Sequence, residues 1–237
     1  MDLKNKVAIV TGASKGIGRE VALGLAKEEC NLVLVGRDTE ALKTTADDCK
    51  KYGIETIIQI FDLSVLSNIP SIVEVAKKQF GKINIVVNNA GYYQKGNPYT
   101  TSLDEWDRSL AVLLQAPYHL TNLAIKEIPE DEGGAIIFNS SIAGKITYKT
   151  GGAYCMAKHG LAAYANCLFE DLREKNIRVS TFYAGFVNTE MGREDHLDPE
   201  KMIQPEEFAE QMVFFLKNSQ SSCIREVVVS PRVSPRK

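Results

Sequence analysis

Tyr154 and Lys158 stand four residues apart in the segment YCMAK. On a helix this spacing places both side chains on one face. A tyrosine with its ordinary pKa of about 10 is a poor acid or base at neutral pH, and a neighbouring ammonium lowers that pKa by favouring the phenolate. The pair is therefore a candidate for proton transfer. Tyrosine–lysine pairs are also common on helix surfaces, so the surrounding elements must decide between these interpretations.

The segment TGASKGIG, residues 11–18, is a glycine-rich turn between an apolar run and an amphipathic stretch. Glycines allow the backbone to turn tightly and approach a ligand, and the first turn of a helix offers N–H groups and a positive dipole to an anion. A tight turn without a ligand is the alternative. Its place between the first predicted strand and the first predicted helix favours a dinucleotide phosphate.

Short β-branched runs recur between longer amphipathic stretches, as in an α/β protein. Most of these runs are continuously apolar, which is typical of strands buried on both faces of a parallel sheet. Because no linker or repeat interrupts the alternation, we expect residues 1–237 to form one doubly wound, Rossmann-type domain with helices flanking the sheet. The seven predicted strands are residues 6–12, 31–37, 55–63, 83–91, 135–141, 177–185 and 225–231.

One polar segment breaks this rhythm at residues 185–207, where two prolines precede the last predicted helix. A long irregular segment in a compact domain is often a lid or binding loop. We expect a substrate loop at about residues 186–204, with a variable surface loop as the alternative. We interpret the basic tail, residues 230–237, as a flexible end.

The composition is that of a soluble globular protein, with 44% hydrophobic and 24% charged residues. A net charge of -2 gives no general attraction to nucleic acid or membrane phosphates, so neither is an expected partner. The N-terminal segment predicts neither a signal peptide nor a membrane span. Five cysteines without CxxC spacing predict free thiols in a reducing, cytoplasmic compartment. Three scattered histidines give no metal-site pattern.

The motifs TGxxxGxG at 11–18, NNAG at 88–91 and YxxxK at 154–158 occur in the order typical of one family. Together they resemble the short-chain dehydrogenase/reductase family from about residue 5 to 190, and more loosely to the last strand. The resemblance implies a nicotinamide-dependent oxidoreductase acting on a carbonyl or secondary alcohol. It also implies a homodimer or homotetramer, formed through helices at about 102–127 and 152–175.

The resemblance assigns three catalytic residues. In the family a serine lies thirteen residues before the tyrosine and three before a glycine, and Ser141 meets both counts while Ser140 meets neither. Ser141 would hydrogen-bond the substrate oxygen, and Tyr154 would act as acid and base. Lys158 would hold the nicotinamide ribose and, with the positive charge of the oxidised nicotinamide, lower the pKa of Tyr154.

The end of the second strand favours NADP(H) over NAD(H). A carboxylate there would bind the adenosine ribose of NAD, but Gly36 is followed by Arg37, and Lys15 lies in the glycine loop. Two cations without an acid suit a 2′-phosphate. Asp38 is the counter-argument, although it begins the next helix and is more simply an N-cap.

The resemblance extends the cofactor site to the ends of later strands. There, Asp62 and Leu63 would hold the adenine, and residues 89–91 the adenosine ribose, while Asp62 is also a candidate helix cap. The backbone of Val187 and the hydroxyl of Thr189 would bind the carboxamide. The predicted cofactor-binding residues are Gly12, Ser14, Lys15, Gly16, Ile17, Gly18, Arg37, Asp62, Leu63, Asn89, Ala90, Gly91, Tyr154, Lys158, Gly185, Val187 and Thr189.

Two positions depart from the family pattern. Ala184 replaces a proline beside the nicotinamide, and Leu113 occupies the place of an asparagine that supports a proton-relaying water. Leucine cannot hold water by hydrogen bonding, so helix-core packing is its natural role. We hypothesise that the relay is reorganised around Ser109, one turn earlier, or around backbone carbonyls.

The motifs favour an NADP(H)-dependent carbonyl reductase for a ketone, aldehyde, 3-oxoacyl or hydroxy acid type of substrate. The glycine-rich finish associated with 3-oxoacyl reductases is absent from the end of the chain. The alternative is a catalytically weak or inactive NADP(H)-binding sensor or scaffold. Four aromatic residues could line the substrate pocket, namely Tyr92, Tyr93, Tyr148 and Phe186.

Overall fold

The computed structural model describes residues 1–193, 196–218 and 221–236. Its seven strands form one parallel sheet in the order β3-β2-β1-β4-β5-β6-β7, which confirms the predicted fold class. Every predicted strand is present, with its ends within three residues of the prediction. The strands are β1 (Val7–Thr11), β2 (Asn31–Gly36), β3 (Thr56–Ile60), β4 (Ile85–Asn88), β5 (Gly134–Ser141), β6 (Ile177–Ala184) and β7 (Glu226–Val229).

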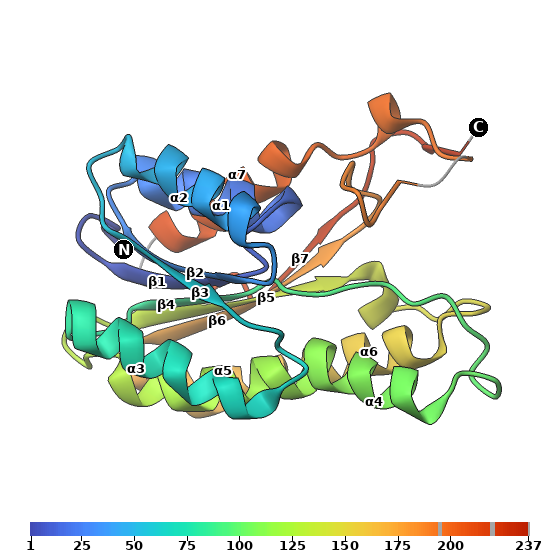
Figure 1. Ribbon diagram of the computed structural model, residues 1–237, viewed down its shortest axis with the longest axis horizontal. Helices are drawn as coiled ribbons and strands as arrows, with labels where there is room; N and C mark the ends of the chain where they lie inside the picture. The colour runs from blue at the N-terminus through green and yellow to red at the C-terminus, as the bar shows by residue number, and fades with distance from the viewer. Residues whose placement is uncertain (194–195, 219–220, 237) are drawn as a thin grey trace.

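The helices cover both faces of the sheet, as Figure 1 shows: α1, α2 and α7 lie on one side and α3 to α6 on the other. A π-helical turn at Ala111–Gln115 joins α4 to α5. The helices are α1 (Gly16–Lys27), α2 (Thr39–Lys50), α3 (Ile69–Phe80), α4 (Leu103–Leu110), α5 (Ala116–Ala124), α6 (Gly152–Leu172) and α7 (Pro205–Lys217).

Most of the strands are continuously apolar because both faces of the sheet are covered, whereas the edge strand β7 alternates between exposed and partly buried positions. Ala8 and Val10 point into the core beneath α1, α2 and α7, whereas Ile9, between them, packs against the core of α3 and α5. All three side chains are fully buried. Burying an aliphatic side chain of this size contributes about 1.5–3 kcal/mol, so a continuous run stabilises such a strand more than an alternating one.

The strand order reverses between β1 and β4, which are hydrogen-bonded neighbours. In open α/β sheets the crevice at such a point, outside the carboxyl ends of the strands, is the usual ligand site. Here the reversal brings the glycine loop after β1 beside the residues that follow β4. Ala90 N and Asn89 N both donate to Thr11 Oγ1, at 3.0 and 2.9 Å.

The segment between β6 and α7 contains the predicted substrate loop, of which residues 194 and 195 lie outside the described residues. Its two ends are joined by a bridge between Val187 and Ile203, and Asn188 N donates to Ile203 O at 2.8 Å. A short 3-10 turn at Pro199–Lys201 precedes this closure. The loop is therefore an organised element next to the sheet.

The expectation of a flexible C-terminal tail is wrong for residues 230–236. Asp198 N donates to Pro235 O at 2.7 Å, and Leu197 pairs with Arg236 in an antiparallel bridge. Pro235 is buried. Figure 1 shows this end of the chain lying beside the segment before α7. Backbone pairing and burial of a proline, rather than the charge of the tail, decide its position.

Three further features bear on the classes of function. Among the residues that the structure describes, no helix is both long and apolar enough to cross a membrane. Within those residues, no group of three histidine, cysteine or acidic side chains is arranged to hold a metal ion. All five cysteines are free thiols.

Candidate active site

A cavity of about 1280 Å³ opens at the carboxyl end of the sheet. It is lined by the glycine loop, by the residues after β2 to β6 and by the beginning of α6. This volume exceeds the roughly 300–1,000 Å³ of a typical small-ligand pocket. Every predicted site residue lines the cavity except Gly18. The sequence motifs therefore converge on one space.

Gly18 is required for packing. A Cβ atom there would lie 2.2 Å from Gly12 O and 2.4 Å from Asn89 Nδ2, so no other residue fits. Gly12 has a φ of +67°, and a Cβ on it would lie 2.9 Å from Ala90 Cα. The two glycines thus let the turn, the helix and the segment after β4 meet closely. Gly18 lies behind the cavity wall and acts through this contact.

The N-terminus of α1 is open to an anion. Lys15, at the N-cap, makes no side-chain capping bond, and the first turn contains no acidic residue. The N–H groups of such a turn lack helical partners and carry the positive end of the helix dipole. Together with the glycine turn, this end of the cavity fits a dinucleotide phosphate.

The charged residues at the end of β2, which would select between NADP and NAD, differ in one respect from the sequence expectation. Asp38 caps α2 by accepting from Ala41 N at 3.1 Å, as predicted. The expected absence of an acid is wrong, because Asp62 Oδ2 lies 3.7 Å from an Arg37 nitrogen. The Arg37 side chain is still 63% exposed and free to turn toward a ligand. Lys15 pairs with Glu190 of the loop after β6.

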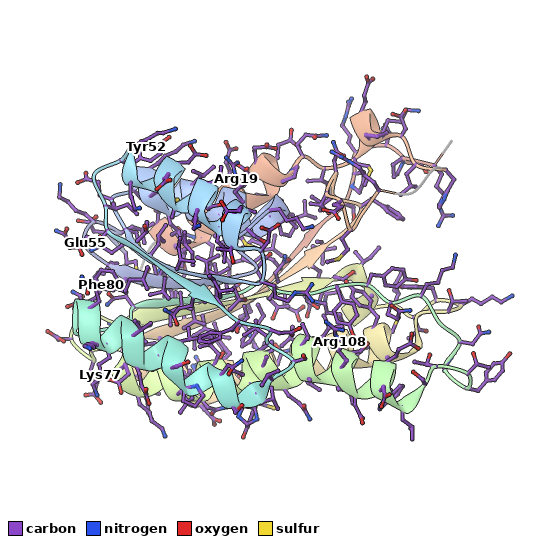
Figure 2. The ribbon with its side chains drawn as sticks, in the orientation of Figure 1. Arg19, Tyr52, Glu55, Lys77, Phe80 and Arg108 are labelled. Atoms are coloured by element: carbon purple, nitrogen blue, oxygen red, sulfur yellow. The ribbon has the colours of Figure 1, made fainter. Side chains whose placement is uncertain are left out.

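Arg108 is a further member of this charged group that the sequence did not indicate. It comes from α4 (Figure 2) and lies 3.3 Å from Asp62 Oδ2. Burial raises the pKa of Asp62, but hydrogen bonds from Ser64 and the two nearby arginines outweigh this effect and lower it. Asp62 also caps its turn by accepting from Ser64 N at 2.9 Å. Only the packing of α4 brings Arg108 here, so no local motif marks it.

The three predicted catalytic side chains meet at the same cavity. Ser141 ends β5, and its Oγ accepts from Ala143 N at 3.2 Å, which fixes the hydroxyl at the start of a short turn. Tyr154 and Lys158 lie on successive turns of α6. Lys158 Nζ is 5.8 Å from the centre of the Tyr154 ring. The arrangement brings a hydroxyl, a phenol and an ammonium to one place.

A chain of hydrogen bonds holds Lys158 from the centre of the sheet. Lys158 Nζ donates to Asn139 O at 2.8 Å, and Asn139 Nδ2 donates to Asn89 Oδ1 at 2.8 Å. Asn89 Nδ2 in turn donates to Thr11 O at 2.9 Å. Burial lowers the pKa of Lys158 to about 8. Asn139 was not predicted as a site residue; its sequence signal is an amide directly after the apolar run of β5.

The environment of Tyr154 is more apolar than the sequence suggests. Burial raises the pKa of Tyr154, while a hydrogen bond with Ser141 opposes this effect. In the protein alone the pKa is therefore raised, opposite to the direction expected with Lys158 and an oxidised nicotinamide. Tyr93 packs edge-on against Tyr154, with ring centres 5.3 Å apart, and Tyr148 lies 6.5 Å beyond Tyr93. These rings form an aromatic wall beside the phenol.

Leu113 packs in the core, as its side chain suggests. It is 1% exposed, and its Cδ2 would lie 3.2 Å from a Cβ placed on Gly91. In the structure, Ser109 Oγ is within hydrogen-bond distance of Tyr92 Oη, at 3.1 Å. This hydrogen bond competes with the water that the hypothesis places on Ser109. Ser109 is buried as well. Backbone carbonyls are the other group named in that hypothesis.

The replacement at Ala184 leaves the following backbone well held. Gly185 N donates to Val229 O at 2.8 Å, and Ile203 N donates to Phe186 O at 3.0 Å. Thr189 packs over the glycine loop, with its Cγ2 3.0 Å from where a Cβ on Gly16 would lie. The loop after β6 and the glycine loop thus close the same end of the cavity.

Comparison with known proteins agrees with this geometry. The family profile described as short chain dehydrogenase matches residues 6–200. An uncharacterized oxidoreductase of Staphylococcus saprophyticus is 29% identical over 234 residues, covering 98% of this chain and 99% of its own. The 3-oxoacyl-acyl-carrier-protein reductase FabG of Chlamydia muridarum is 32% identical over 96% of each chain.

Solved structures show the same fold over nearly the whole chain. A metagenomic short-chain oxidoreductase in complex with NADP has 31% identity and a TM-score of 0.85, covering 99% of this chain and all of its own. L-Sorbose reductase from Gluconobacter frateurii, complexed with NADPH and L-sorbose, has 27% identity and a TM-score of 0.87 over 98% of each chain.

Proposed function

The chain belongs to the short-chain dehydrogenase family, and from this premise we propose that it is an NADP(H)-dependent reductase of carbonyl compounds, reversibly an alcohol dehydrogenase. The observation that carries the proposal is the convergence of Ser141, Tyr154 and Lys158 at the cavity that begins at the glycine loop. A dinucleotide phosphate fits the N-terminus of α1, which has no side-chain cap. Gly12 and Gly18 in the turn before it have no room for a Cβ atom.

The preference for NADP(H) rests on the charges at the end of β2. The Arg37 side chain is mostly exposed, so its guanidinium is available to a 2′-phosphate. Position 36, at the end of β2, is a glycine and not the acidic residue that would bind the ribose of NAD. Asp38, the competing acid, is committed to capping α2. Two similar proteins were solved with NADP and NADPH, which supports the same choice here.

A nicotinamide dinucleotide bound here would supply the hydride. In the reductive direction Tyr154 donates its phenolic proton to the carbonyl oxygen, and burial of this side chain keeps the donor form populated at neutral pH. The Ser141 hydroxyl, fixed by Ala143 N, hydrogen-bonds the same oxygen as negative charge develops. The Lys158 ammonium, held by Asn139 O, stabilises the resulting phenolate.

The test is NADPH oxidation, followed by absorbance, against a panel of ketones, aldehydes and 3-oxo esters. Tyr154→Phe should lower kcat by about 10²–10⁴-fold, the usual contribution of a general acid. Tyr52→Phe is the matched control, because Tyr52 is an exposed tyrosine that lies just after α2 and outside the cavity lining. Its activity should equal that of the wild type.

The competing function is an NADP(H)-binding sensor or scaffold, supported by Leu113 and Ala184. NADPH binding without turnover of any carbonyl, and no effect of Tyr154→Phe, would favour it over the reductase.

We also propose a cytoplasmic homodimer or homotetramer. The exposed side chains of Leu103, Tyr118 and Met156 on α4, α5 and α6 support association through these helices. Light scattering tests the assembly.

A further inference from the structure

We propose that the substrate carries an acidic group beside its carbonyl, and that the C-terminal tail forms part of the substrate site through Arg236. This inference rests on the proposed reductase function and deepens it. It assigns a substrate class, a carboxylate or phosphate monoester, and a specificity-determining residue that lies outside the matched family segment, residues 6–200.

The tail is built into one wall of the cavity. Its backbone is fastened to the loop after β6 by the 2.7 Å bond from Asp198 N to Pro235 O and by the bridge between Leu197 and Arg236. Arg236 makes this bridge with its backbone, and it lines the cavity together with Arg193. A residue near the end of the chain thus lines the same cavity as the catalytic side chains.

The opposite wall carries a third cation. Lys95 lines the cavity two residues after Tyr93, whose ring contacts Tyr154. The segment is held in place by the bridge between Gly96 and Gly151. In Figure 1 the segments before α4 and α6 run on one side, and the segment before α7 runs with the C-terminal end on the other.

Among the residues that the structure describes, these three cations have no acidic partner. No carboxylate within residues 1–193, 196–218 and 221–236 pairs with Lys95, Arg193 or Arg236. By contrast, Lys15 and Arg37, at the cofactor end, pair with Glu190 and Asp62.

Glu190 and Glu206 also line the cavity, and Glu190 pairs with Lys15. Within the described residues, the three cations therefore outnumber Glu206 and leave a net positive charge. A cleft lined by charges of one sign concentrates ligands of the opposite sign. A guanidinium binds carboxylate and phosphate oxygens with paired hydrogen bonds.

The aromatic wall suits the rest of such a substrate. Tyr93 and Tyr148 stand beside Tyr154, and Ile146 and Met191 also line the cavity. These side chains offer apolar surface to a carbon chain between the carbonyl, at Tyr154, and the acidic group, at the mouth. The three cations would attract an acidic ketone and would give no such advantage to a neutral one.

The experiment compares charged and neutral members of two substrate pairs. These are 4-oxopentanoate with its methyl ester, and dihydroxyacetone phosphate with dihydroxyacetone. The wild type should reduce at least one charged member with the higher kcat/KM, and this preference should shrink as salt is added. The pair that shows it distinguishes a carboxylate from a phosphate.

Arg236→Gln should raise KM for the charged member about fivefold and leave the neutral member unchanged, in keeping with a solvent-exposed ion pair. Arg232→Gln is the matched control, because Arg232 is an exposed arginine of the same tail that does not line the cavity. It should change neither substrate. An equal loss for both members would show that Arg236 only supports the loop, and would overturn the proposal.

Two further outcomes separate this inference from the proposed function. If Arg236→Gln raises KM for NADPH without a difference between charged and neutral substrates, Arg236 serves the cofactor phosphates and the inference is wrong. If none of the four compounds oxidises NADPH, and the wider carbonyl panel also fails, the reductase function is contradicted. Calorimetric titration of the NADPH-loaded protein with the same compounds then tests the inference. The inference requires that a charged member bind more tightly than its neutral counterpart, and that Arg236→Gln abolish this difference.

Discussion

Replacing Lys158 with methionine removes a buried ammonium and keeps a flexible side chain of similar length. Burial lowers the pKa of Lys158 from 10.5 to about 8, which corresponds to about 3 kcal/mol at roughly 1.4 kcal/mol per pKa unit. The bond from Lys158 Nζ to Asn139 O at 2.8 Å offsets about 1–2 kcal/mol of this penalty. We therefore expect Lys158→Met to raise the free energy of unfolding by about 1–2 kcal/mol at pH 7.

The increase in the free energy of unfolding caused by Lys158→Met should become smaller as the pH rises. The unfolded state binds a proton at Lys158 below about pH 10.5, whereas the folded state does so only below about pH 8. Wild-type stability should therefore rise between these two pH values relative to the variant. The advantage of Lys158→Met should be complete below pH 8 and fade as the pH approaches 10.5.

Urea unfolding at several pH values from 7 to 10.5 measures this difference, and a gain of about 2–8 °C in Tm at pH 7 should accompany it. The same variant should lose carbonyl reduction, because nothing then stabilises the phenolate. Lys175→Met, at an exposed lysine with no ion pair among the described residues, is the control and should show no pH-dependent gain. A less stable Lys158→Met protein at pH 7, or a gain independent of pH, would refute the reasoning.

Three other changes test separate parts of the structure. Arg37→Gln should lower kcat/KM for NADPH about tenfold and leave that for NADH unchanged, because only the former carries a 2′-phosphate; equal losses would contradict this. Leu113→Asn should keep or raise turnover, measured beside Tm, and a large loss of activity in a folded variant would count against a reorganised relay. Hydrogen bonds from Lys6 and Lys82 lower the pKa of Glu132 to about 2. Glu132→Gln should therefore lower the free energy of unfolding by about 1–2 kcal/mol above pH 4.5, after allowance for solvent. This loss should vanish toward pH 2, and a loss that persists there would exclude the ion pairs as its cause.

The sequence by itself determined the elements and the order of the motifs. Continuous apolar runs predicted most of the strands, because a strand covered on both faces of its sheet is buried at every position. Local chemistry was equally readable: Asp38 caps its helix, and the spacing of Tyr154 and Lys158 puts them on successive turns of α6. Such features depend on residues a few positions apart, so the chain records them directly.

The tertiary structure alone decided which distant side chains meet. Asp62 neutralises part of the charge of Arg37, and Arg108 joins them from α4. Asn139 holds Lys158. None of these pairs shares a local pattern, because helix packing and strand order bring them together.

The same holds for the raised pKa of Tyr154, which follows from burial that no single segment encodes. The tail shows the limit most clearly, since its basic composition suggests a free end. Burial of Pro235 and pairing of Arg236 with Leu197 instead make it a wall of the site. These contacts join segments that are separate in the chain, so no local pattern records them.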